Sequence, residues 1–314
     1  MTTPRAVLVV CFKRVDRTVE LLSRIRDSRP DILYVACDGP RPHVPGEAEA
    51  CQQVQRVFDS VDWPCEVVRD FSPENMGSGP RIISALRSMS EVCNQFVVIE
   101  DDLLPEPEFF RFVYDQLDRY VDIPKIGSVS GSSFLRSAGL LRNSYYFSRY
   151  PNTLGWGVYS STISSVDFEP DPDRVRTALG SIFPRRLEAT EWARFVRLVY
   201  ENKVSAWDFQ FCISQFLAGK LQVIPRVRLI ANNGAGPDAT HVGVNDDFIS
   251  RPVYARALEM RHPKLIWRNP ILDALYSLGV VQPQFRLYKK YRPYGQELRK
   301  RLVDNRLMKD GSPW

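Results

Sequence analysis

The sequence predicts an α/β fold: a Rossmann-like, mostly parallel sheet with helices on both faces. Apolar strand-like runs alternate with amphipathic helical runs through the first half of the chain, which is the pattern of βαβ units. The chain has 314 residues, 44% of them hydrophobic, which is enough for one large domain or a domain plus an extension.

The predicted elements follow one another closely up to residue 130. Asp16 can cap the first helix, and Pro80 suits the first turn of the third. We predict strands at residues 6–11, 32–37, 65–69, 95–100 and 126–130, and helices at 16–27, 47–60, 80–93 and 107–120. Beyond residue 130 the pattern is looser, and two helices stand out, near 187–202 and 208–218.

The composition and the missing motifs exclude several classes of protein. Charged residues make up 25% of the chain, which argues against a disordered protein, and no apolar run is long enough for a transmembrane helix. The apolar run at 6–10 is too short for a signal peptide, so we expect a cytoplasmic protein with six reduced, mostly buried cysteines. Neither a Walker-type loop nor a G-x-S-x-G elbow occurs, which argues against an ATPase or a hydrolase.

Three acidic residues, Glu100, Asp101 and Asp102, directly follow the strand predicted at 95–100. Ligands of open α/β sheets bind beyond the carboxyl ends of the strands. Adjacent carboxylates repel one another unless something positive binds, and Mn²⁺ or Mg²⁺ is commonly held by one or two carboxylates together with substrate phosphates. The alternative is that these acids cap the helix at 107–120.

Several short motifs carry a resemblance to a known family. The E-D-D segment with Phe109-Phe110 after it resembles the corresponding region of GT-A glycosyltransferases, and is most similar to the N-acetylglucosaminyltransferase I type and to bacterial haemolytic protein A-like sugar transferases. Four further segments match in the same order: Glu74-Asn75-Met76-Gly77-Ser78-Gly79, Leu154-Gly155-Trp156-Gly157, Trp207-Asp208-Phe209-Gln210 and Asp238-Ala239-Thr240-His241. The resemblance covers about residues 6–241 and leaves out the tail.

The resemblance implies roles for several acids. Asp102 would reach a divalent metal, Mn²⁺ or Mg²⁺, while Asp101 would lie near the sugar or ribose and Glu100 near the sugar. Asp38 would accept a hydrogen bond from uracil N3–H, which makes UDP the expected nucleotide; otherwise Asp38 forms a turn before Pro40.

Asp208 stands between Trp207 and Phe209 at the start of a predicted helix. A carboxylate among aromatic rings is desolvated, which raises its pKa and makes it a better base. The match to the family adds to this argument for a catalytic base. The alternative is that Asp208 only caps its helix.

Basic and polar residues near the strand ends are candidates for the diphosphate. Arg14 follows the first strand and can bind a phosphate bidentately. Asn75 and Arg81 belong to a glycine-rich turn that opens a helix, where backbone N–H groups favour anions. His241, in a loop of flexible composition, is a candidate for the diphosphate or the metal. Each of these side chains can instead be an ordinary solvated residue.

Two tryptophans are candidates for the acceptor side. Trp156, flanked by Gly155 and Gly157, can stack on a sugar face or be a core residue, and Trp207 precedes the predicted base.

Together these observations predict a metal-dependent hexosyl- or N-acetylhexosaminyl-type transferase of polysaccharide biosynthesis. Residues 1–262 would move a sugar from a nucleotide-sugar donor to a hydroxyl of a glycan or lipid-linked acceptor, with inversion. One alternative is a sugar-1-phosphate nucleotidyltransferase, which needs a glycine-rich signature after the first strand, whereas Cys11-Phe12-Lys13-Arg14 has no glycine. Another alternative is a non-catalytic carbohydrate- or membrane-binding module.

The C-terminal extension, residues 263–314, differs in charge from the body of the chain. From Arg261 to Trp314 there are twelve Lys or Arg and four Asp or Glu residues, so this end carries +8 while the first 260 residues carry −3. Aromatics alternate with cations in it, as around Lys289-Lys290. We expect the extension to dock on the anionic inner leaflet of a membrane, or else to pack on the catalytic domain; nucleic acid is not an expected partner.

Overall fold

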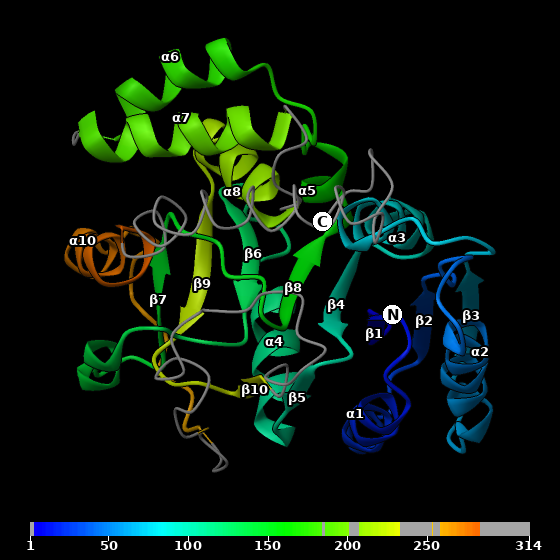
Figure 1. Ribbon diagram of the computed structural model, residues 1–314. Helices are drawn as coiled ribbons and strands as arrows, with labels where there is room; N and C mark the ends of the chain where they lie inside the picture. Colours follow the sequence, from blue (N-terminus) through cyan, green and yellow to red (C-terminus); the bar gives the residue numbers. More distant parts are fainter. Residues whose placement is uncertain (1–2, 184–185, 201–206, 233–252, 254–257, 283–314) are drawn as a thin grey trace.

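The computed structural model describes residues 3–183, 186–200, 207–232, 253 and 258–282. Its centre is an eight-stranded sheet with the order β3-β2-β1-β4-β8-β6-β9-β7 (Figure 1). Six strands run in one direction, while β8 and β7 run in the other, which confirms the predicted α/β fold with a mostly parallel sheet. The strands are β1 (Ala6–Cys11), β2 (Ile32–Cys37), β3 (Glu66–Phe71), β4 (Gln95–Glu100), β6 (Ile126–Ser130), β7 (Tyr145–Ser148), β8 (Trp156–Tyr159) and β9 (Leu221–Pro225).

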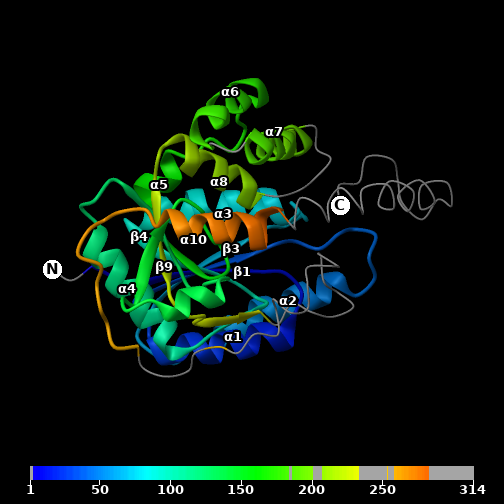
Figure 2. The same ribbon diagram turned by 90° about the vertical axis from the view of Figure 1, so that its left-hand side faces the viewer.

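Helices cover both faces of the sheet because the strands are apolar on both sides (Figure 2). Val7 and Val9 of β1 point into a core formed with α1 (Val15–Ser28), α2 (Glu47–Val57) and α4 (Pro107–Tyr120). Ala6 and Leu8 point the other way, into a core with α3 (Ser78–Val92), α5 (Ser160–Ser164) and α8 (Trp207–Leu217). On this second side α6 (Pro172–Ile182) and α7 (Arg186–Tyr200) pack on α8.

Most predicted elements of the first half are confirmed. The strands at 6–11, 32–37, 95–100 and 126–130 and the helix at 107–120 have the predicted bounds. The helix predicted at 47–60 is instead α2 followed by a 3₁₀ turn, Phe58–Ser60. The prediction that Asp16 caps α1 is wrong: Arg14 is the N-cap, and Asp16 lies in the first turn, where its charge favours the helix dipole.

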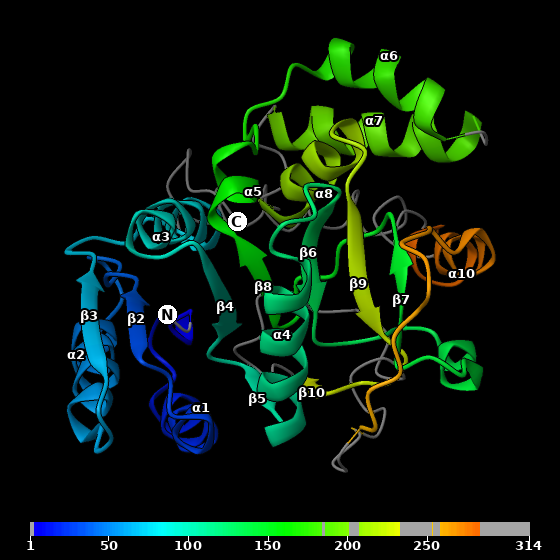
Figure 3. The ribbon, with the colours of Figure 1, turned by 180° about the vertical axis from the view of Figure 1, so that it is seen from behind.

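Strands β1, β2 and β4 are parallel neighbours, so their carboxyl ends lie at one edge of the sheet, and this edge positions the candidate site; Figure 3 shows β4 leading into β5 beside β10. Val10 is paired with Glu100, and Cys11 with Cys37, so β1, β2 and β4 end side by side. Beyond β4 the chain forms β5 (Leu103–Pro105), which pairs with β10 (Ile230–Asn232). The loops after β1, β2 and β4 are therefore neighbours.

The described part of the C-terminal extension lies against β7, the outermost strand of the sheet at the end away from β3. The Asn269 N–H donates to the Phe147 carbonyl (2.8 Å), and the Ser148 hydroxyl donates to Asp273 (2.6 Å) of α10 (Pro270–Tyr276). These bonds tie the extension to β7, and the remainder of the tail lies outside the described residues. Within the described residues no helix is long and apolar enough to cross a membrane.

Candidate functional site

The three acids at the end of β4 have different surroundings. The Asp101 N–H donates to the Val10 carbonyl (3.0 Å), which extends the pairing with β1 by one residue. The carboxylate of Asp101 is buried and accepts hydrogen bonds from Arg14 Nη1 (2.9 Å) and the Phe12 N–H (3.3 Å). Asp102 lies 3.5 Å from the same Arg14 nitrogen, but its side chain is 26% exposed. Asp102 is thus the acid of this pair that a ligand from solvent can reach.

Burial and neighbouring charge raise the pKa values of Glu100 and Asp101. Loss of hydration raises the pKa of Glu100 to about 8, and the charges of Asp102, Asp101 and Asp208 add to this effect. Burial also raises the pKa of Asp101 to about 6, although Arg14 opposes the shift. The strand end therefore resists further negative charge and favours an added cation.

Asp208 lies in the first turn of α8, and its charge acts on Glu100. The helix is held there by its aromatic residues: Trp207 stacks on Trp156 of β8 (6.1 Å between ring centroids), and Phe211 contacts the same ring (4.8 Å). Because β8 is hydrogen-bonded to β4, this packing brings the start of α8 to the acidic strand end. Two parts of the chain more than a hundred residues apart thus contribute carboxylates to one place.

The two tryptophans that were candidates for the acceptor side are both buried in this structure. Trp156 is only 1% exposed and Trp207 is buried, so neither ring offers a free face on which a sugar can stack. The alternative interpretation of Trp156, a core residue, is correct. The rings act indirectly, since their stacking holds Asp208 in position.

Asp38 follows β2 and joins two loops at the same edge. Its carboxylate accepts four hydrogen bonds of 2.9–3.1 Å, from the backbone N–H groups of Gly39, Met76 and Gly77 and from the Asn75 side chain. The two loops approach so closely that a Cβ on Gly39 would lie 2.5 Å from the Glu74 backbone, and Gly77 has a φ of +83°. A carboxylate can usually accept about four hydrogen bonds, and Asp38 uses all of them to join the two loops. The contact with a nucleobase stays a prediction.

The guanidinium of Arg81, a predicted candidate for the diphosphate, contacts β3 in this structure. It is buried and pairs with Asp70 of β3 (3.0 Å), and it also donates to the Asp70 carbonyl. An arginine committed to such a pair braces α3 against β3. Asn75 remains near the surface, where its amide also donates to the Gly39 carbonyl (2.9 Å).

The loops after β1 and β2 carry three cations. Arg14 lies between Asp101 and Asp102, while Lys13 and Arg41 both pair with Glu47 (2.9 Å each). Hydrogen bonds from Arg41 and Lys13 hold the pKa of the buried Glu47 at about 2 despite its burial. Sequence reasoning missed Arg41; the available signal was a cation three residues after Asp38, in the loop that follows a parallel strand.

A divalent metal at the acidic strand end would need ligands from the substrate as well as from the protein. Among the described residues no group of three or more His, Cys, Asp or Glu side chains is arranged to hold a metal ion. A metal can also be held by one or two carboxylates together with substrate phosphates, and Asp102 is accessible for that purpose. The other predicted ligand, His241, lies outside the described residues.

No protein-family model and no curated protein match the chain. Solved structures do. A mannosyltransferase from Pyrobaculum calidifontis in complex with GDP-Man and Mn²⁺ is 13% identical over 69% of this chain and 70% of that chain, with a TM-score of 0.37. Mouse xyloside xylosyltransferase 1 in its apo form is 10% identical over 70% and 84% of the two chains (TM-score 0.38). UTP-bound UGPase from Acinetobacter baumannii is 9% identical over 74% and 90% (TM-score 0.37). Similarities this distant do not determine the function, so the geometry of the site has to support it.

The raised pKa of Glu100 predicts how the stability of the metal-free protein depends on pH. The Glu100 carboxyl titrates at about 8 in the folded protein, against an ordinary value of 4.5. Between these values the unfolded chain binds fewer protons, so the free energy of unfolding decreases as the pH rises through this window. Glu100→Gln removes the group, and we expect a smaller decrease when urea unfolding is measured across the window in EDTA. Parallel pH profiles for the two proteins would contradict this description of the site.

Proposed function

We propose that the protein is a metal-dependent glycosyltransferase of the GT-A type that transfers a sugar from a nucleoside diphosphate, expected to be UDP, to an acceptor hydroxyl. The observation that carries the proposal is the meeting of the β4 acids with Asp208 at the carboxyl edge of the sheet, where Asp208 raises the pKa of Glu100. Ligands bind at this edge in open α/β sheets. Asp102, which is open to solvent, would serve the donor side of the site, and Asp208, on a neighbouring helix, would serve the acceptor side.

On the donor side, Asp102 would hold Mn²⁺ or Mg²⁺. When bound, the metal would supply a Lewis acid that neutralises charge on the departing diphosphate. Asp101 and Arg14 have a supporting part, since their 2.9 Å ion pair fixes the β1 loop beside Asp102. Lys13 and Arg41, held by Glu47 at the ends of β1 and β2, add positive charge at the same edge.

On the acceptor side, Asp208 would take the proton of the attacking hydroxyl. General base catalysis of this kind contributes roughly 10²–10⁴ in rate. The position suits the role: Asp208 lies near enough to Glu100 for its charge to act on that acid, and the packing of Trp207 on Trp156 holds the start of α8 there. A single base and a direct attack on the anomeric carbon give inversion of configuration.

Asp102→Ala should abolish turnover of a UDP-sugar in the presence of Mn²⁺, because the substitution removes the accessible carboxylate. The fold should persist, since the side chain lies at a loop. Hydrolysis and transfer with a panel of UDP- and GDP-sugars measure the effect, and Asp122→Ala, at an exposed loop position, is the control. Equal wild-type activity with EDTA and with Mn²⁺ would contradict metal dependence. Formation of a nucleotide-sugar from UTP and a sugar 1-phosphate would identify a nucleotidyltransferase instead.

Asp208→Asn keeps the shape of the side chain and removes its ability to accept a proton. We expect transfer to decrease at least about a hundredfold while nucleotide-sugar affinity persists, as measured by kcat and by titration calorimetry. Asp173→Asn, on the exposed surface of α6, should behave as wild type. If the Asp208 variant keeps more than about a tenth of the wild-type kcat, Asp208 is not the base. A product that retains the anomeric configuration of the donor would rule out single displacement.

A further inference from the structure

Apolar side chains gather on the surface of the described part of the C-terminal extension. Leu265, Trp267 and Ile271 are 76%, 73% and 72% exposed. Leu275 and Leu278 are exposed as well, so five large hydrophobic residues lie on the surface within fourteen positions. Isolated exposed apolar residues need no explanation, but a concentration of this kind marks an interaction site.

The local structure explains why these residues face outward together. In the extended segment before α10, Leu265 and Trp267 are two positions apart and point away from Ile266, which packs against the core. In α10 and the π-helical turn that follows it (Ser277–Val281), the exposed residues are spaced at 271, 275 and 278, along one helix face. The opposite helix face buries Leu272 against the sheet edge. We term these five residues the apolar face; Figure 2 shows α10, which carries Ile271 and Leu275.

Basic residues outnumber acidic residues in the sequence that carries and follows the apolar face. Arg261, Lys264 and Arg268 lie in the same stretch of chain. The stretch from 258 to 282 has two acidic residues: Asp273 is buried beside Arg268 (3.6 Å), and Glu259 is paired with Arg261 (2.8 Å). The sequence from 283 to 314 then adds nine basic and three acidic residues.

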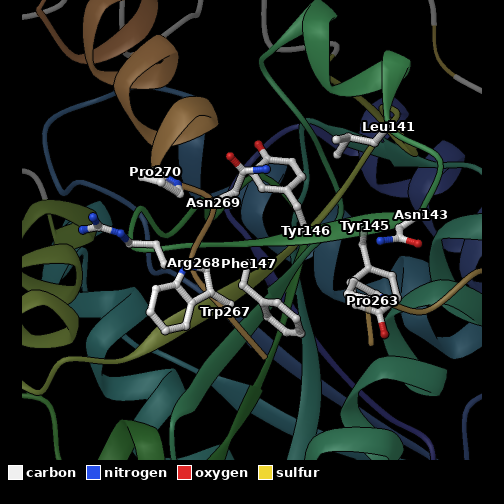
Figure 4. Close-up of a pocket in the computed structure, with 10 residues that line it drawn as sticks. All are labelled: Leu141, Asn143, Tyr145, Tyr146, Phe147, Pro263, Trp267, Arg268, Asn269 and Pro270. Atoms are coloured by element: carbon white, nitrogen blue, oxygen red, sulfur yellow. The ribbon is translucent and has the colours of Figure 1, made fainter. Parts of the chain in front are cut away.

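A small cavity opens beside Trp267, between β7 and residues 263–270 (Figure 4). Its volume is about 290 Å³, and its lining combines aromatic rings with the polar groups of Asn143, Arg268 and Asn269. Leu141 lines it too, and its neighbour Leu140 is the most exposed of the large hydrophobic side chains in the described part of the chain. Aromatic, aliphatic and cationic groups close together are the combination found where proteins meet the interface of a bilayer.

We propose that the apolar face docks the protein on the surface of an anionic lipid bilayer. Leu265, Trp267 and Ile271 would enter the interface, while the surrounding cations meet anionic headgroups, one of which the cavity beside Trp267 can accept. A second copy of this chain fits the face less well, because a symmetric contact would bring two sets of cations together. The proposal does not depend on the transferase reaction.

Co-sedimentation of the full-length protein with vesicles tests the proposal. Vesicles of phosphatidylcholine mixed with phosphatidylglycerol should bind the protein, vesicles of phosphatidylcholine alone should bind it weakly, and salt should weaken the binding. The variant Leu265→Gln/Trp267→Gln/Ile271→Gln should lower the partition coefficient at least about tenfold. The matched control is Val19→Gln/Val121→Gln, which changes two half-exposed valines on other surfaces and should bind as wild type.

Three outcomes would overturn the proposal. The first is no binding to anionic vesicles at low salt. The second is unchanged binding of the triple variant with a normal unfolding curve, which would assign binding to the basic tail alone. The third is a dimeric wild type and a monomeric triple variant in light scattering, which would show that a second copy covers the face.

Discussion

The repulsion among carboxylates at the end of β4 is the constraint on which the candidate site depends. Glu100, Asp101 and Asp102 are consecutive, and Asp208 adds a fourth negative group from α8. Arg14 compensates part of this charge through its contacts with Asp101 and Asp102, while burial, together with the charges of Asp102, Asp101 and Asp208, raises the pKa of Glu100 to about 8. A site with this imbalance is suited to a ligand that includes a cation.

The rest of the fold brings these groups together and keeps them there. Strands β1, β2 and β4 are buried on both faces, so their ends are fixed and their loops meet at one edge. Asp38 locks the glycine turn at 75–77 to the end of β2 through four hydrogen bonds. The stack of Trp156 on Trp207 sets the first turn of α8 against β8. The same edge thus combines rigid strands with short loops, which is a common arrangement for binding sites.

Sequence reasoning predicted the first half of the fold well because its signals are local. Apolar runs such as residues 95–100 end at polar residues, and the helix at 107–120 begins at a proline, so both bounds can be read from neighbouring residues. The short strands β7, β8 and β9 were not predicted, because they lie beyond residue 130, where aromatic and glycine-rich stretches replace the regular alternation of strand and helix patterns.

The site was predictable in part for a related reason. The acids of β4 stand out because charge directly after a buried strand is unusual. The surroundings of Arg81 and Trp156, in contrast, depend on partners distant in sequence. Asp70 takes the guanidinium of Arg81, and Trp207 with Phe211 covers the ring of Trp156. No pattern around either residue indicates these contacts. Arg41 was missed for the converse reason, since its importance arises from Glu47 and the adjacent β1 loop.

We propose that the acidic strand end binds a divalent metal together with a nucleoside diphosphate. Crystals grown with UDP and Mn²⁺, measured for the anomalous scattering of manganese, test it most directly. We expect one strong peak at coordination distance from the Asp102 carboxylate and the diphosphate, and its loss in Asp102→Ala crystals. Bound UDP with no manganese near Asp102, or the same peak in the variant, would contradict it.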